Sequence, residues 1–148
     1  MEELGYQAGQ HELLAEQYQK HFPQEIKLAV KDAQKIVDTL KKELKCYQTD
    51  LEKSYKHLDK TKLKYVKSQE DLTSIKESIS SKTDLENKDE ILTKEQQTEE
   101  HKVEYAVQLV ATNKVQAEYY ESHLQTLLAR LEKLCEGQCQ YFTSVMTR

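Results

Sequence analysis

Eight lysines recur at three outer positions of a seven-residue repeat in the first half of the chain. With Leu44 taken as a core position, the lysines that share each position are Lys31 and Lys45, then Lys35, Lys42 and Lys56, then Lys53, Lys60 and Lys67. On a helix these positions form one outward band, here called the lysine band. Flexible ammonium groups suit the phosphates of lipid headgroups, whose positions vary, better than they suit one rigid ligand. The band therefore predicts contact with an anionic membrane, at about 1 kcal/mol per lysine.

The same lysines also fit a purely solvating role. Residues 20–67 hold 13 lysines and 7 acidic residues, whereas residues 69–104 hold 5 lysines and 11 acidic residues. Such a basic block favours an anionic partner. However, three acid–lysine pairs have the spacing of ion pairs on a helix surface: Asp32–Lys35, Asp38–Lys42 and Glu52–Lys56. In this alternative the lysines pair locally and bind no lipid.

Other reactive side chains do not form a recognisable site. Cys135 and Cys139 share a helix face and His123 precedes them, but no further ligands complete the four that structural zinc needs. No phosphate-binding glycine loop, nucleophile elbow or zinc-protease motif occurs. With two arginines in the chain and no aromatic sheet pattern, base stacking has no evident platform. We therefore expect no catalytic residues, cofactor, metal or nucleic-acid partner.

A long heptad repeat supplies the helix that positions the lysines. From Val30 to Ile79 every seventh residue is apolar or aromatic, and no proline or glycine interrupts the segment. A repeat of this length keeps one stripe against a partner only if the helices supercoil. Upstream, Pro23 lacks an amide proton and predicts a kink or a break. We place this first long helix at about residues 9–80.

A second heptad segment follows a polar connection. Its positions are Val103, Ala106, Val110, Asn113, Ala117, Tyr120, Leu124, Leu127, Leu131, Leu134, Gln138, Tyr141 and Val145. Thr83–Glu86 and Thr93–Gln96 have the spacing of capping boxes. We place the connection at about residues 81–93 and the second helix at about 94–145. The predicted fold is all-α, an elongated antiparallel helical hairpin or coiled-coil bundle. The expected core or dimer residues are Val37, Leu40, Leu44, Leu51, Leu58, Leu72, Tyr120, Leu124, Leu127 and Leu131.

Composition agrees with long helices. Three glycines and one proline leave few turns in 148 residues, and 32% of the residues are charged against 37% apolar. Helices that bury only stripes gain stability from a second chain, so we expect a homodimer. Three cysteines form no disulfide framework and favour a reducing, cytoplasmic setting. The first ten residues carry no basic and apolar run typical of a secretory signal.

Three segments carry a resemblance to a known family. These segments are AGQHELLAE at 8–16, SYKHLDKTKLKY at 54–65 and EEHKVEYAVQLVATNKVQAEYYESHLQTLLARLEKLCE at 99–136. In this order and spacing the chain resembles the F-BAR domains of the formin-binding-protein/Toca group. The resemblance implies a crescent-shaped antiparallel homodimer that binds anionic membrane and senses or generates curvature, in endocytosis or at the cytoskeleton.

The resemblance also sets expectations beyond the helices themselves. Residues 1–148 would form part of an F-BAR domain, with further helices before and after them in a longer protein. The protein would be cytoplasmic and peripheral at membranes. Actin-regulatory or endocytic proteins would bind regions outside this chain. The alternative from the residues alone is a structural coiled-coil dimerisation or scaffold module without lipid binding.

Overall fold

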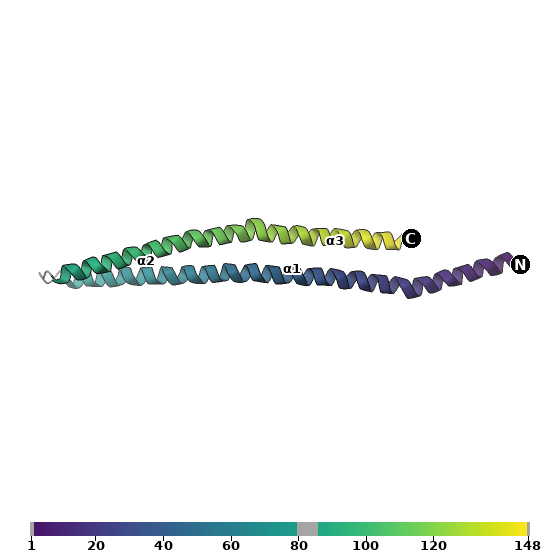
Figure 1. Ribbon diagram of the computed structural model, residues 1–148, viewed down its shortest axis with the longest axis horizontal. Helices are drawn as coiled ribbons and strands as arrows, with labels where there is room; N and C mark the ends of the chain where they lie inside the picture. Colours follow the sequence, from purple (N-terminus) through teal and green to yellow (C-terminus); the bar gives the residue numbers. More distant parts are fainter. Residues whose placement is uncertain (1, 80–85, 148) are drawn as a thin grey trace. The chain divides into compact units, whose positions relative to one another are not determined.

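The computed structural model describes residues 2–79 and 86–147 (Figure 1). The helices are α1 (Glu2–Ile79), α2 (Glu86–Ala117), a six-residue π-helix η1 (Glu118–His123) and α3 (Leu124–Met146). The chain divides into two compact units. The terminal unit contains residues 1–43 and 126–148, and the central unit contains residues 44–125. The expected all-α class, with long helices packed together, is confirmed.

The helix boundaries differ from the predicted ones. α1 begins at Glu2 and runs through Pro23, so the proline does not break the helix, and Figure 1 shows a bend in the N-terminal part of α1. α2 begins at Glu86, so residues 86–93 are helical and do not belong to the connection. The Thr93 hydroxyl donates to the Asp89 carbonyl at 2.8 Å, within the helix, and caps nothing. Thr83 of the other predicted cap lies outside the described residues.

In the central unit α1 and α2 form an antiparallel helical hairpin. Ser54 contacts Thr112 and Ser68 contacts Thr98, so positions further along α1 meet positions earlier in α2. The α1 stripe predicted from the heptad faces this seam. Its members in this unit are partly or fully buried: Leu44, Tyr47, Leu51, Ser54, Leu58, Thr61, Tyr65, Ser68, Leu72 and Ile75. The heptad interpretation of α1 is thus confirmed here.

Along α2 the predicted heptad positions do not face α1. The predicted members between 103 and 120 are all exposed: Val103, Ala106, Val110, Asn113, Ala117 and Tyr120. The residues that face α1 instead are Thr98, His101, Tyr105, Gln108, Thr112, Val115 and Tyr119. Small hydroxyl side chains explain why this face of α2 packs against α1. The hydroxyls of Thr112 and Ser54 lie 3.0 Å apart and bond to each other in a seam where the helices approach closely. The α2 seam is therefore mostly polar.

The π-helix η1 separates two phases of burial along the second half of the chain. After η1 most positions of the predicted stripe are partly or fully buried, among them Leu124, Leu127 and Leu134, whereas Leu131 is exposed. A π-turn holds one residue more than an α-turn, which rotates the following side chains by about 100° about the helix axis. The π-helix thereby changes which positions face α1. No capping residue or proline marks this change in the sequence.

The terminal unit pairs the first part of α1 with α3. Leu40 on α1 and Leu127 and Val145 on α3 are buried, and Val37 is partly buried. Arg130 forms a bidentate ion pair with Glu43, with the second bond at 3.2 Å. Leu131 is 39% exposed, and in the central unit Tyr120 is 50% exposed. These two expected core residues do not belong to the intrachain core.

Candidate functional site

All eight residues of the lysine band are exposed on α1. They are exposed because the a and d positions of the same heptad face the seam, which leaves the positions opposite for solvent. Within the described residues, six of the eight form no ion pair: Lys31, Lys42, Lys45, Lys56, Lys60 and Lys67. Lys35 pairs with Asp32 at 2.8 Å and Lys53 pairs with Asp50 at 3.2 Å. Most of the band is therefore free to bind another anion.

The local ion pairs that a purely solvating band would use are mostly absent from the described residues. Of the three pairs with suitable spacing, Asp32–Lys35 forms. Asp38 instead accepts a hydrogen bond from the Gln34 amide at 2.9 Å, on the side away from Lys42 along the chain. Exposed pairs of this kind contribute at most about 1 kcal/mol, so even Lys35 can exchange its partner at low cost.

Lysines outside the band have a different role. Lys64 reaches Glu104 on α2 at 3.2 Å, and Lys76 reaches Glu95 at 2.6 Å. Both pairs link α1 to α2 across the edge of the seam. On α2 itself, the hydrogen bond from Lys102 to Glu99, together with the charge of that carboxylate, raises the pKa of Lys102. Lys64 and Lys76 near the seam thus stabilise the hairpin, whereas the band lysines other than Lys67 lie away from the seam.

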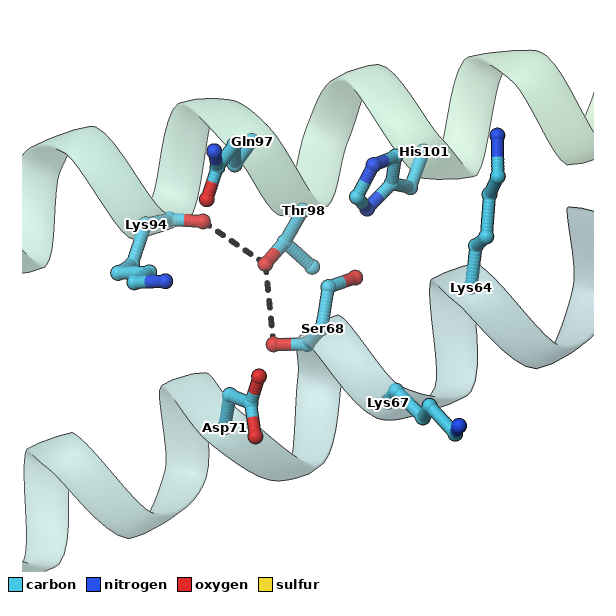
Figure 2. Close-up of a pocket in the computed structure, with 8 residues that line it drawn as sticks. All are labelled: Lys64, Lys67, Ser68, Asp71, Lys94, Gln97, Thr98 and His101. Atoms are coloured by element: carbon cyan, nitrogen blue, oxygen red, sulfur yellow. Dashed lines mark hydrogen bonds between the residues drawn. The ribbon is translucent and has the colours of Figure 1, made fainter.

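A polar groove of about 240 Å³ lies between α1 and α2 (Figure 2). Its lining residues are Lys64, Lys67, Ser68, Asp71, Lys94, Gln97, Thr98 and His101. At its centre the Thr98 hydroxyl donates to the Ser68 carbonyl at 3.2 Å and lies 2.8 Å from the Lys94 carbonyl. The Nδ1 atom of His101 is buried and has no hydrogen-bond partner among the described residues. In Figure 2 the ammonium groups of Lys67 and Lys94 lie on opposite sides of the Thr98–Ser68 contact, so they do not converge on one ligand.

Aromatic side chains cluster beside the π-helix. The rings of Tyr47 and His123 stack at 4.0 Å with an interplanar angle of 4°. Tyr119 is buried, and its hydroxyl lies 3.5 Å from the amide nitrogen of Gln48. Tyr47 belongs to the α1 stripe that faces the seam, whereas the sequence associated His123 only with the cysteines. The stacked pair gives His123 a packing role in the hairpin.

The cysteines lie on exposed helix surface. Cys46, Cys135 and Cys139 are free thiols, and all three are exposed. Within residues 2–79 and 86–147 no group of three or more histidine, cysteine or acidic side chains is arranged to hold a metal ion. None of the helices described here combines the length and the apolar character needed to cross a membrane.

A second apolar face occurs on α2, opposite the seam. Val103, Val107 and Val110 are 54%, 64% and 69% exposed. We call these three residues the outer valine stripe. They recur at spacings of four and three, which places them on one helix face. The heptad of the second helix includes Val103 and Val110, but periodicity does not say which neighbour such a stripe meets.

Comparison with known proteins identifies no relative. No protein-family model matches the chain, and neither a curated protein nor a solved structure matches it.

Proposed function

We propose that this chain is a homodimeric helical module that binds anionic phospholipid at the cytosolic face of membranes through the lysine band of α1. The observation that supports this proposal best is the exposure of all eight band lysines, six of which form no ion pair within the described residues. The resemblance to F-BAR domains supports the same role. A band that only solvated the helix would not need unpaired lysines, because lysines paired with neighbouring acidic residues solvate it equally well.

The proposed mechanism is electrostatic adhesion to a stiff surface. Each ammonium group near an anionic leaflet contributes about 1 kcal/mol, and the attraction falls off within a Debye length of about 10 Å at 0.1 M salt. Lysines held along a rigid helix adhere best to lipid whose curvature matches the face that presents them. A dimer doubles the number of lysines that act together, which increases avidity. The module would therefore sense or generate membrane curvature.

Vesicle cosedimentation tests the proposal. The chain is mixed with vesicles of neutral phosphatidylcholine or with vesicles that also contain phosphatidylserine, at about 0.05 M and at about 0.5 M salt, between which the Debye length falls about threefold. We expect pelleting with the anionic vesicles at low salt, and little pelleting with neutral vesicles or at high salt. Equal pelleting with both vesicle types, or none with either, contradicts the proposal.

A second candidate is a structural coiled-coil dimerisation or scaffold module that binds no lipid. The outer valine stripe favours it, because an exposed apolar face on a helix suits another helix and plays no part in binding headgroups. This candidate predicts the same helicity and the same dimer. It differs in predicting no vesicle binding at any salt concentration, so the cosedimentation experiment separates the two.

A further inference from the structure

Packing does not explain why Cys135 and Cys139 lie where they do. Both are free thiols exposed on α3, which is one continuous helix from Leu124 to Met146. A free cysteine behaves as a small apolar residue and is among the residue types most often buried. Two exposed cysteines gain nothing from burial. The property that this face of α3 offers is therefore the chemistry of two thiols.

The helix fixes the spacing of the two thiols. Residues four apart lie on the same face of a helix, with their Cβ atoms about 5–6 Å apart. A disulfide bond requires Cβ atoms about 3.5–4.5 Å apart. Two thiolates on opposite sides of one metal ion, each with a bond of about 2.3 Å, hold their sulfur atoms about 4.6 Å apart. The intact helix therefore suits a bridging metal ion better than a disulfide bond.

The number of ligands selects the kind of metal ion. Glu132 and Glu136 precede the cysteines by three residues each, on the same helix face. Yet in residues 86–147, as in residues 2–79, no three histidine, cysteine or acidic side chains are arranged to hold a metal ion together. Structural zinc and iron–sulfur clusters need about four ligands. Thiolates also favour Cu(I), a soft ion that is stable between two thiolates in a linear arrangement.

We propose that Cys135 and Cys139 form a two-thiolate site for Cu(I) on the exposed face of α3. Each thiol releases its proton when it binds, and the ion keeps its oxidation state throughout. The expectation of no metal rested on the four ligands of structural zinc, whereas this site needs two. The proposal rests neither on the lysine band nor on a dimer, so its failure would leave the lipid-binding proposal untouched.

Gly137 lies in the turn that such an ion would span. A Cβ atom at this position would meet nothing within 4 Å, so packing does not require the glycine. Glycine inside a helix costs about 1 kcal/mol relative to alanine, which makes this turn intrinsically weak. An ion that joins Cys135 to Cys139 holds the turn in helical form. Gly137→Ala should therefore bind Cu(I) at least as tightly as the unmodified chain.

A competition titration tests the site. Cu(I) is added without oxygen to the full chain in the presence of a chelator that changes colour when it binds Cu(I). We expect one ion per chain, held at least about a hundredfold more tightly than by Cys135→Ser, because a second linked ligand raises affinity by about 10²–10⁴. Cys46→Ser is the matched control and should bind like the unmodified chain. Equal binding by Cys135→Ser, or one ion shared by two chains, overturns the proposal.

A shifted cysteine tests whether the helix face matters. Cys139→Ser combined with Gln140→Cys keeps three thiols in the chain, and position 140 is also exposed. The shift turns the second thiol by about 100° around the helix axis, away from Cys135. We expect this variant to bind Cu(I) at least about tenfold more weakly than the unmodified chain, with circular dichroism showing the same helicity. Equal binding by the shifted variant overturns the proposal, because any two nearby cysteines would then suffice.

Discussion

Thr112 provides the sharpest test of the polar seam between α1 and α2. Its side chain is 1% exposed, and its hydroxyl contacts the Ser54 hydroxyl at 3.0 Å and the Gln108 amide nitrogen at 3.1 Å. Thr112→Val keeps the shape but leaves these polar groups without a partner. An unsatisfied buried polar group costs about 1–3 kcal/mol, so we expect the free energy of unfolding to fall by that amount.

Urea unfolding followed by circular dichroism, at one fixed protein concentration, measures the effect. Thr49→Val is the matched control, because Thr49 is exposed and its hydroxyl only donates to the Lys45 carbonyl. The control should change the free energy of unfolding by no more than about 0.5 kcal/mol. Combining Thr112→Val with Ser54→Ala removes both hydroxyls, so the double variant should lose less than the sum of the single variants. Equal effects of Thr112→Val and Thr49→Val would refute the assignment of this seam.

Three further predictions concern the rest of the fold. Leu127→Ala should lower the free energy of unfolding by about 2–5 kcal/mol in the same assay, whereas Leu128→Ala, at an exposed position, should cost less than about 1 kcal/mol; similar losses would contradict the core assignment. Deleting Glu121 from η1 should lower the melting temperature, because the extra residue of the π-turn rotates the side chains of α3 so that its stripe faces α1. Glu121→Ala keeps that residue and should leave the melting temperature unchanged. An unchanged melting temperature after the deletion would argue against this role of η1. Ellman's reagent should titrate all three thiols without denaturant, since each is exposed, and a thiol that reacts only after unfolding would contradict this.

The first helix was predictable because its pattern is consistent over many heptads. Leu44, Leu51 and Leu58 recur at every seventh position, and the observed seam follows the same positions. The face of α2 that packs against α1 was not predictable, because α2 has two candidate faces. Periodicity ranks the valines above Thr98 and Thr112, but hydroxyl pairing across a close seam selected the threonines. Such pairing depends on the neighbouring helix, which no pattern within α2 records.

The exposure of the lysine band followed from the heptad, whereas the ion pairs between its lysines and neighbouring acidic residues did not. Outer positions of a helix face solvent once the seam is known, which explains why all eight lysines are exposed. Which acid a lysine meets depends on competing side chains, as Asp38 shows by accepting a hydrogen bond from Gln34. The phase change at η1 also escaped prediction, because a π-helix has no sequence signature comparable to a proline or a glycine.

The most direct test of the lysine band is a pair of charge-reversed variants with equal net charge. One replaces Lys35, Lys42, Lys45 and Lys56 by glutamate, and the control replaces Lys88, Lys94, Lys102 and Lys133, which lie on α2 and α3. At about 1 kcal/mol per lysine, the band variant should bind phosphatidylserine-containing vesicles at least about a hundredfold more weakly than the unmodified chain. The control should retain most of the binding. Equal losses in the two variants, or unchanged binding by the band variant, would contradict the assignment of lipid contact to this face of α1.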